Sequence, residues 1–411
     1  MQYKSVKTAV IGCGMISDIY MQNLKEKFSI IDFVGCSDLV SEKSKKQAEK
    51  YGVKQMTNEE ILNDPEIELV LNLTYPTSHF EVSKAILSAG KHCYSEKLMC
   101  LTLDEAKELD KIRKEKNVMF TVAPDTFLGA SEQTARLIVE RGLIGDVVQI
   151  ISNRPRGYHL IKTTEDDNYR KFSVMHEGGG IPYDMGGYDL HTLFNIFGPI
   201  ESVCGFAETR NANRPYLNPR HEKFNENFFV NTENTMCASM KFKSGPLLSF
   251  TISSEFNVSG SMLMIMGTEG ILHVPDTNNF GDPIYLQKGN GEKMEFPLCH
   301  PFRENSRGIG AADMAWALRT GRKPRLSFEM SYHTLEVLKA VCDSSKDGTT
   351  KHLTTEFEIP KPISTEFYNG TSEERSEQDA HAGSEVGNGD SSNPPSNGAL
   401  RNRGRCRSGL R

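Results

Sequence analysis

The first 123 residues constrain the fold most, because short apolar runs alternate there with segments of helical spacing. Helical spacing runs from Glu42 to Tyr51 and from His79 to Ser88, and Thr102 followed by Glu105 is the capping-box pattern of a helix start. The strand candidates are Val6–Ile11, Ile31–Cys36, Leu69–Leu73, His92–Ser95 and Val118–Val122. Strands that alternate with helices are typical of βαβ units, so this region predicts an α/β domain with a doubly wound parallel sheet.

After about Pro124, hairpin patterns replace crossover patterns. A helix is expected over Ser131–Arg141, and a longer apolar strand over Val147–Ser152. Three pairs of strand candidates flank turn-forming segments: Thr235–Phe242 with Leu247–Ser254, Met262–Met266 with Ile271–Val274, and Ile284–Gln287 with Lys293–Phe296. Helices over Ala311–Arg319 and Ser331–Cys342 should cover one face of the resulting, mostly antiparallel sheet. We therefore expect a first domain over residues 1–123 and a second, α+β domain over residues 124–365.

Residues 366–411 are expected to form a disordered tail. Up to Leu400 they are mainly Ser, Glu, Gly and Asn, with too few large apolar side chains to offset the entropy of ordering. This tail explains part of the low hydrophobic fraction of 37%. The final eleven residues carry five arginines and no acid, which can contact RNA, a membrane surface or an acidic partner. We favour the simpler interpretation of a solvated extension.

Composition excludes several classes of protein. With 48 Lys and Arg against 54 Asp and Glu, the net charge is −6, and no basic stripe points to nucleic acid as a partner. No apolar run is long enough to span a membrane, and no charged-then-apolar signal segment precedes the first strand. The nine cysteines are scattered and never spaced as C-x-x-C, which indicates reduced thiols of a cytoplasmic protein and no metal site.

A glycine loop follows the first strand. Gly12 and Gly14, continued by Met15 and Ile16, separate this strand from a helix; one glycine makes the turn and the next lets the backbone approach a pyrophosphate. The second strand leads to Asp38, whose carboxylate can accept the ribose hydroxyls of NAD and repels a 2′-phosphate. Three lysines shortly after it leave NADP open, and the alternative for Asp38 is a turn or cap residue. Together these residues predict a nicotinamide cofactor.

Glu96 and Lys97 follow a later strand of the same sheet. Ligands of open α/β sheets bind beyond such strand ends, and a lysine there can donate a proton or anchor a substrate hydroxyl. Taken alone, the two residues could also form a surface ion pair.

A helix that follows residues 178–180, three consecutive glycines, carries Asp184, Tyr188 and His191 at positions i, i+4 and i+7. The three side chains therefore share one face of the helix. An acid, a phenol and an imidazole on one face suit hydroxyl recognition and proton transfer. The alternative is structural, with Asp184 capping the helix and Tyr188 packing in the core.

In combination, these motifs resemble the Gfo/Idh/MocA family of nicotinamide-dependent oxidoreductases over about residues 5–362. The resemblance rests on the glycine loop, on Thr74-Tyr75-Pro76 with His79, on Ala89-Gly90-Lys91-His92 leading to Glu96-Lys97, and on Asp184, Gly186 and Tyr188 of the helix. Residues 124–130 and 303–313 are similar to a bacterial subgroup of sugar-type dehydrogenases. The motifs are specific for the family and not for a substrate.

The resemblance implies a Rossmann domain that binds NAD(P), and a second domain whose open sheet often forms the interface of a homo-oligomer, a dimer or a tetramer. It implies that Lys97 is the catalytic lysine, Asp184 the substrate-binding acid and Tyr188 the acid/base. The implied cofactor contacts are Gly12, Gly14, Met15, Ile16, Asp38, Thr74, Pro76, His79, Glu96 and Lys97. His191 and Asp125 are expected near the substrate. Leu98 departs from the family, which has proline after the lysine.

We therefore expect hydride transfer between NAD(P)(H) and a secondary alcohol or ketone of a sugar, cyclitol or similar polyol. An isolated phenol loses its proton only near pH 10, and a nearby ammonium favours the phenolate, so Lys97 and Tyr188 are expected to act as a pair. The alternatives are an NAD-dependent glycosidase of the same fold, in which each cycle restores the cofactor, and a non-catalytic NAD(H)-binding protein.

Overall fold

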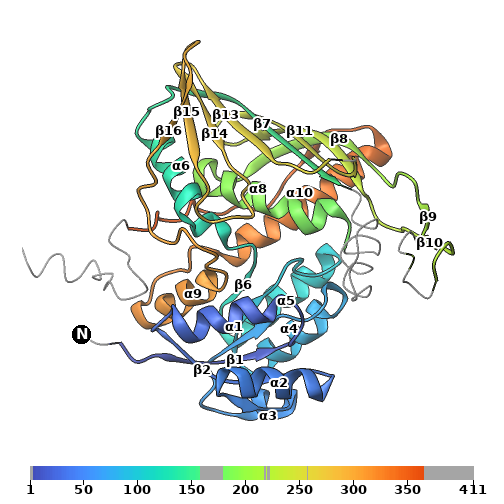
Figure 1. Ribbon diagram of the computed structural model, residues 1–411, viewed down its shortest axis with the longest axis vertical. Helices are drawn as coiled ribbons and strands as arrows, with labels where there is room; N and C mark the ends of the chain where they lie inside the picture. Colours follow the sequence, from blue (N-terminus) through green and yellow to red (C-terminus); the bar gives the residue numbers. More distant parts are fainter. Residues whose placement is uncertain (1–2, 158–178, 217–218, 220–222, 257, 365–411) are drawn as a thin grey trace, which may run out of the picture. The chain divides into compact units, whose positions relative to one another are not determined.

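The computed structural model describes residues 3–364 apart from 158–178, 217–218, 220–222 and 257 (Figure 1). Two large sheets organise these residues, one of six strands and one of nine, together with a small hairpin of β9 (Asn213–Pro215) and β10 (Asn227–Phe229). The tail expected at residues 366–411 and the first glycine of the triplet, Gly178, lie outside the described residues. The boundaries expected after residues 123 and 365 stay predictions.

The six-stranded sheet is parallel throughout, in the order β3-β2-β1-β4-β5-β6. Its strands are β1 (Val6–Ile11), β2 (Ile31–Ser37), β3 (Lys54–Gln55), β4 (Leu69–Asn72), β5 (His92–Ser95) and β6 (Phe120–Val122). The helices between them are α1 (Ser17–Glu26), α2 (Ser41–Tyr51), α3 (Asn58–Asn63), α4 (His79–Ser88) and α5 (Leu103–Lys116). The strand order reverses between β1 and β4, the place where open α/β sheets bind ligands. The predicted doubly wound sheet is confirmed.

Local sequence explains where these helices start. Thr102 caps α5 as predicted: its hydroxyl accepts the Glu105 N–H at 3.2 Å, and the Glu105 carboxylate accepts the Thr102 N–H at 3.0 Å. A second capping box, formed by Thr57 and Glu60, starts α3. The sequence analysis did not single out α3 or the two-residue strand β3.

The nine-stranded sheet has the order β16-β15-β14-β13-β7-β12-β11-β8-β17. Its strands are β7 (Val147–Gly157), β8 (Ile200–Glu208), β11 (Thr235–Phe242), β12 (Leu247–Phe256), β13 (Met262–Gly267), β14 (Gly270–Val274), β15 (Ile284–Lys288), β16 (Lys293–Phe296) and β17 (Lys351–His352). Every neighbouring pair is antiparallel except β7 with β12, so the mostly antiparallel sheet is confirmed. Buried and exposed residues alternate along β11, as in a sheet with one covered face.

Two long helices, α8 (Ile181–Phe197) and α10 (Phe328–Asp347), cover one face of this sheet (Figure 1). The shorter helix α6 (Ala130–Glu140) contacts both α8 and β14. The predicted packing of the second late helix, Ser331–Cys342, is confirmed, since α10 lies on β8.

The other late helix does not cover the nine-stranded sheet, so that prediction is wrong. Helix α9 (Ile309–Thr320) follows a loop in which Gly308 lies against Tyr20, Leu24 and Phe28 of the first domain. At its far end, Arg319 forms a bidentate ion pair with Glu68 at 2.6 and 2.9 Å. Its apolar pattern alone does not tell which sheet buries it.

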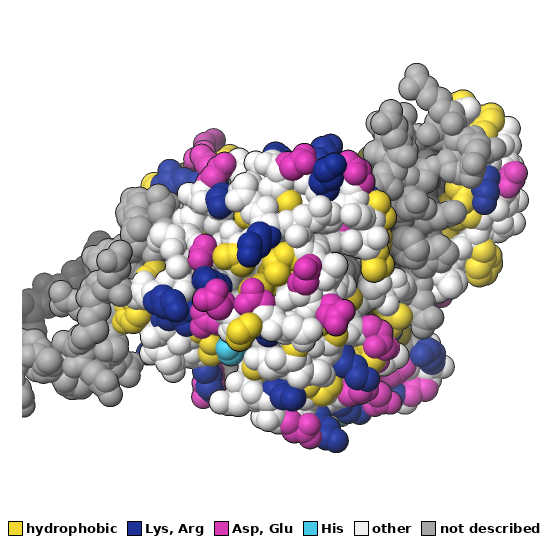
Figure 2. Space-filling view, turned by 90° about the horizontal axis from the view of Figure 1, so that it is seen from below, with side chains coloured by type: hydrophobic (Ala, Val, Ile, Leu, Met, Phe, Trp, Pro, Cys, Tyr) yellow, Lys and Arg dark blue, Asp and Glu magenta, His cyan; other side chains and the backbone are white. Residues whose placement is uncertain are grey.

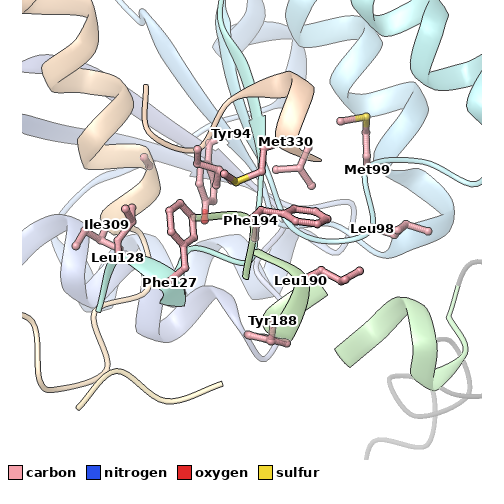
Figure 3. Packing of buried hydrophobic residues seen from close by; sticks show 14 of the residues in the cluster. Tyr94, Leu98, Met99, Phe127, Leu128, Tyr188, Leu190, Phe194, Ile309 and Met330 are labelled. Atoms are coloured by element: carbon pink, nitrogen blue, oxygen red, sulfur yellow. The ribbon is translucent and has the colours of Figure 1, made fainter. Parts of the chain in front are cut away.

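An apolar cluster joins the segments around this junction (Figure 3). It contains Tyr94 of β5, Phe127 of the short 3₁₀ helix η2 (Thr126–Leu128), Phe194 of α8 and Ile309 of α9, all buried. Because these residues come from both parts of the chain, the carboxyl ends of the parallel strands lie against α8 and α9.

The surface carries mixed charge. On the face shown in Figure 2, Lys and Arg side chains are interspersed with Asp and Glu side chains. Within the described residues, no helix combines the length and the apolar character needed to cross a membrane.

Candidate active site

The glycine loop after β1 is shaped by two different requirements. Gly12 has a φ of +104°, and a Cβ placed on it would lie 2.6 Å from the carbonyl group of Leu73, so a side chain does not fit there. A Cβ placed on Gly14 would meet no atom of the described chain within 4 Å. Gly12 is therefore needed by the fold, whereas Gly14 leaves open space beside the loop.

Asp38 fixes this loop from the end of β2. Its Oδ2 accepts the Cys13 N–H at 2.7 Å, and its Oδ1 accepts the Val40 N–H at 2.8 Å. The carboxylate thus caps a turn and also lies at the carboxyl edge of the sheet. Met15 is 60% exposed beside the loop, and Ile16 precedes α1, whose first turn has no capping side chain from the described residues.

The segment after β4 contains Thr74, Pro76 and His79. Thr74 donates its hydroxyl proton to the Asn72 side chain at 2.6 Å, and Pro76 starts the 3₁₀ helix η1 (Pro76–Ser78). His79 is fully buried; its Nδ1 lies 2.5 Å from the Leu98 carbonyl oxygen and its Nε2 3.0 Å from that of Thr74. Burial lowers the pKa of this imidazole. His79 thus holds two loops together, and the cofactor contact expected of it stays a prediction.

Leu98 keeps the chain beside Lys97 fixed without proline. Its side chain is buried, its carbonyl group contacts His79, and the peptide bond before it is cis. Glu96 is buried as well: one carboxylate oxygen accepts the Tyr20 hydroxyl at 2.6 Å and the other accepts the Lys97 N–H at 3.0 Å. Glu96 thus anchors the backbone of Lys97.

Lys97, Asp184 and Tyr188 come together although 87 residues separate the first two. The Lys97 ammonium lies 2.9 Å from Asp184 Oδ1 and 5.3 Å from the centre of the Tyr188 ring. Lys97 comes from the end of β5, and the other two residues from the first half of α8. This arrangement places an acid, an ammonium and a phenol at the carboxyl edge of the parallel sheet, as the spacing on α8 predicts.

His191 does not join this cluster. It is 1% exposed, its Nδ1 lies 2.8 Å from the Pro124 carbonyl oxygen, and its ring meets Phe127 edge-on. Burial lowers its pKa to about 4, so the ring is neutral. His191 lies on the same face as Asp184 and Tyr188 but further along the helix axis, about 10.5 Å from Asp184 and about 4.5 Å from Tyr188. His191 packs in the core, and the substrate contact expected of it stays a prediction.

Asp125 is also occupied by the protein. Its carboxylate is 1% exposed and accepts the N–H groups of Gly308 and Gly310 at 2.9 and 3.0 Å, at the start of α9. Burial raises its pKa, against the effect of these hydrogen bonds and of Tyr94. Asp125 thus ties the start of α9 to the loop after β6, and the substrate contact expected of it stays a prediction.

Sequence reasoning missed Arg307, a largely enclosed guanidinium that donates to the Asn278 side chain at 2.6 Å and whose pKa the Tyr188 side chain raises against the effect of burial. It precedes α9 and is separated from Tyr188 by 119 residues. The only signal in the sequence was its place in the segment 303–313, which resembles a subgroup of the family. No spacing rule connects it to α8.

A buried ion pair supports the other side of α8. Arg154 of β7 is fully buried and donates to Asp189 at 2.6 and 3.2 Å. Arg154 also donates to Asp276 and Thr277 of the loop after β14, at 2.7 and 2.6 Å. This network fixes the rotation of α8 and with it the direction in which Asp184 and Tyr188 point.

Comparison with known proteins then identifies the family. Residues 6–124 match the oxidoreductase family with an NAD-binding Rossmann fold, and residues 133–273 match the GFO/IDH/MocA C-terminal domain. The chain belongs to the Gfo/Idh/MocA family of oxidoreductases.

Two curated relatives illustrate the range of similarity. The chain is 33% identical over 210 residues to an uncharacterised oxidoreductase of Schizosaccharomyces pombe, which is 50% of this chain and 55% of that one. It is 24% identical over 214 residues to scyllo-inositol 2-dehydrogenase (NADP(+)) of Bacillus subtilis, covering 51% and 57%. The matches thus span about half the length of these relatives.

Among solved structures, aldose–aldose oxidoreductase from Caulobacter crescentus, complexed with glycerol, superposes with a TM-score of 0.71. The match covers 85% of this chain and 100% of that one at 21% identity. At this identity the likeness concerns the fold.

The residues of this family member fit a dinucleotide. The space beside Gly14, the uncapped first turn of α1 and the Asp38 carboxylate all lie at the edge where β1 and β2 end. Backbone N–H groups at a helix start bind phosphate, and a carboxylate accepts ribose hydroxyls. For a metal ion, by contrast, the described part of the chain offers no group of three His, Cys, Asp or Glu side chains.

Proposed function

We propose that this protein is an NAD(P)-dependent oxidoreductase that transfers hydride between the cofactor and a secondary alcohol or ketone of a sugar, cyclitol or similar polyol. The observation that carries the proposal is the cluster of Lys97, Asp184 and Tyr188 at the carboxyl edge of the parallel sheet. Family membership and a polyol-oxidising relative support it.

In this proposal, each residue of the cluster has a separate role. Tyr188 exchanges the proton of the substrate hydroxyl, since a phenol can both donate and accept. Asp184 uses one oxygen for Lys97, and the other has no partner among the described residues, so it can accept a neighbouring substrate hydroxyl. The Lys97 ammonium holds the Asp184 side chain in place and lies over the Tyr188 ring, where a cation stabilises negative charge that develops during the reaction. When bound, the nicotinamide accepts or donates the hydride.

Cofactor preference, compartment and assembly belong to the same proposal. Asp38 favours NAD over NADP, because its carboxylate repels a 2′-phosphate. The eight cysteines in the described part of the chain are free thiols, which is consistent with the reducing cytoplasm. The nine-stranded sheet exposes Val148, Phe206, Leu247 and Met294, which supports a homo-oligomer, a dimer or a tetramer, formed through this face.

The test is NADH formation and consumption with a panel of polyols and keto-sugars. Tyr188→Phe and Lys97→Ala should each lower kcat by about 100-fold or more, since they remove acid/base chemistry. NADH affinity should stay within about threefold for Tyr188→Phe. The control variants Tyr285→Phe and Lys107→Ala change exposed side chains of the same types and should behave as the wild type.

Three outcomes would overturn the proposal. Full turnover by both Tyr188→Phe and Lys97→Ala would show that these two residues do not carry out the acid/base chemistry. Release of a sugar from a glycoside without net NADH would indicate the NAD-dependent glycosidase. Tight NADH binding without turnover across the whole panel would indicate a non-catalytic binding protein.

A further inference from the structure

A chain of hydrogen bonds links helix α1, which follows the cofactor loop, to the Lys97 side chain. The Tyr20 hydroxyl, on α1, donates to Glu96 Oε1 at 2.6 Å. The second oxygen of this carboxylate accepts the Lys97 N–H at 3.0 Å, and the Lys97 ammonium lies 2.9 Å from Asp184 Oδ1. These groups belong to α1, to the end of β5 and to α8, so the chain runs from the cofactor side of the candidate site to the substrate side.

The Tyr20 hydroxyl is a permanent donor in this chain. Its side chain is buried, with 1% of its surface exposed. Burial and, after it, the negative charge of Glu96 raise the pKa of the Tyr20 phenol well above its usual value. The hydroxyl therefore keeps its proton near neutral pH and donates it to the carboxylate.

Packing holds Tyr20 in this position. The Asn23 side chain, on the next turn of α1, donates to the Asn305 and Arg307 carbonyl oxygens at 3.0 and 2.8 Å. The Tyr20 ring lies 6.0 Å, centre to centre, from the ring of Tyr94, on the strand that leads to the carboxylate. The position of the hydroxyl is thus set by its surroundings and does not depend on the hydrogen bond alone.

Glu96 needs such a donor because its carboxylate is buried, with 8% of the residue exposed. A buried oxygen without a partner costs free energy, so the available donors decide how a buried carboxylate is oriented. With Tyr20 on Oε1, Oε2 faces the Lys97 N–H. Without Tyr20, the carboxylate gains freedom to rotate, and the backbone that carries the Lys97 side chain loses a fixed partner.

A similar hydrogen bond on another side of α1 offers a comparison. The Tyr51 hydroxyl, on α2, donates to Asp18 Oδ1, on α1, at 2.9 Å. The Asp18 side chain is 45% exposed, and it also accepts the Lys50 ammonium of α2 at 2.6 Å. These contacts fasten α1 to α2 and not to the end of β5, so Tyr51 is a matched control for Tyr20.

We propose that Tyr20 is a positioning residue, which acts through Glu96 to hold the Lys97 ammonium in place. This placement keeps the ammonium at Asp184 and over the Tyr188 ring. The inference rests on the proposed function, in which these three groups carry out the chemistry. Tyr20 exchanges no proton with the substrate. It limits the positions open to the ammonium, and a charge fixed in advance stabilises a transition state better than a mobile one.

The first test follows the Lys97 side chain without any substrate. The full chain, with saturating NADH, is treated with a low concentration of acetic anhydride, and mass spectrometry measures the acetylation rate of single lysines. Tyr20→Phe keeps the ring and removes the hydroxyl. In this variant Lys97 should react at least about threefold faster, because an ammonium held by a carboxylate loses its proton less readily.

Two controls separate this effect from general loosening. Lys91 is 6% exposed and donates to the Asp64 and Ile67 carbonyl oxygens at 2.6 and 2.8 Å, within the same domain as Lys97. Its acetylation rate should stay the same in Tyr20→Phe. Tyr51→Phe should leave the rates of both lysines unchanged.

Turnover gives a second readout. With a polyol that the wild type oxidises, Tyr20→Phe should lower kcat by about tenfold, while KM changes by less than about threefold. Glu96→Ala removes the group through which Tyr20 acts, so Tyr20→Phe should cause no further loss of kcat in that background. Tyr51→Phe should keep the kcat of the wild type. The acetylation rates decide the matter even if Glu96→Ala does not fold.

The positioning role and the proposed function fail in different ways. Equal acetylation of Lys97 in the wild type and in Tyr20→Phe overturns the positioning role, even if a polyol is oxidised. A rate that rises for Lys91 and Lys97 alike overturns it too, because the domain is then loosened as a whole. Additive losses of kcat in the double variant contradict action through Glu96. Faster acetylation of Lys97 alone, without turnover of any polyol, supports the positioning role and contradicts the proposed function.

Discussion

The cofactor side and the substrate side of the candidate site are assembled in different ways. On the cofactor side, Gly12, Asp38 and Thr74 each come within two residues of the strand that positions them. On the substrate side, Asp184 and Tyr188 meet Lys97, which lies 87 and 91 residues before them in the sequence. A substitution on the cofactor side should therefore disturb only its own loop. A substitution on the substrate side should also disturb the packing between distant segments.

The difference also appears in how each side treats charge. The Asp38 carboxylate is bound by two backbone N–H groups, which every chain supplies. The orientation of α8 depends on a specific buried pair, Arg154 with Asp189. Burial would raise the pKa of Asp189, but Arg154, Thr277 and Ser152 outweigh it and lower the pKa. The geometry of the substrate side therefore depends on specific side chains, and a substitution of any of them should disturb it.

The largest effect is expected from breaking the buried pair on the substrate side. Asp189→Ala leaves Arg154 short of its main partner and should lower the free energy of unfolding by about 3 kcal/mol or more. Urea unfolding measures this loss, with Asp343→Ala, an exposed acid on α10, as the control. A variant as stable as the wild type would show that the pair does not hold α8.

A smaller and strictly local effect is expected from the cofactor side. Gly12→Ala places a Cβ 2.6 Å from Leu73 at a positive φ and should cost about 2 kcal/mol of stability, together with most NADH affinity. Gly14→Ala should unfold like the wild type, because its Cβ enters open space, yet weaken NADH binding by about tenfold, because that space receives the cofactor. Equal NADH affinity in both variants and the wild type would show that this loop does not bind the cofactor.

The smallest effect is expected at Glu132 of α6, which lies outside both sides. It is fully buried, neither carboxylate oxygen has a hydrogen-bond partner among the described residues, and burial raises its pKa well above the usual value. The folded state therefore binds a proton that the unfolded state releases above about pH 4.3, so stability falls as pH rises through that range.

Glu132→Gln removes this dependence. The variant should match the stability of the wild type at pH 4 and exceed it at pH 8. Thermal unfolding across this pH range measures the difference, and Glu115→Gln, an exposed position on α5, serves as the control. A stability gain that is independent of pH would contradict a buried, protonated Glu132.

Sequence patterns predict those features of this protein that neighbouring residues determine. The parallel strands, the capping box of α5, the hairpin strands and the face shared by Asp184 and Tyr188 all follow from periods of two or 3.6 residues. The sequence also predicts the glycine loop, because binding of a dinucleotide requires glycine at fixed distances from a strand.

The remaining features depend on contacts that no local pattern encodes. Parallel pairing of β7 with β12, the ion pair of Lys97 with Asp184, and the packing of Gly308, at the start of α9, against α1 each join distant segments. His191 shows the opposite case: its spacing places it on the face of Asp184 and Tyr188, but further along α8 that face is covered by Phe127, and the ring is buried. Burial decides a side chain's role, and spacing alone does not measure burial.

The position of α9 has a consequence for biosynthesis. Residues 1–123 contain every strand of the parallel sheet, yet Gly308 can pack against Tyr20, Leu24 and Phe28 only after residue 308 has emerged from the ribosome. A nascent chain stopped anywhere between those points carries an apolar patch in contact with water. The cofactor domain of this protein is thus finished last, although it is begun first.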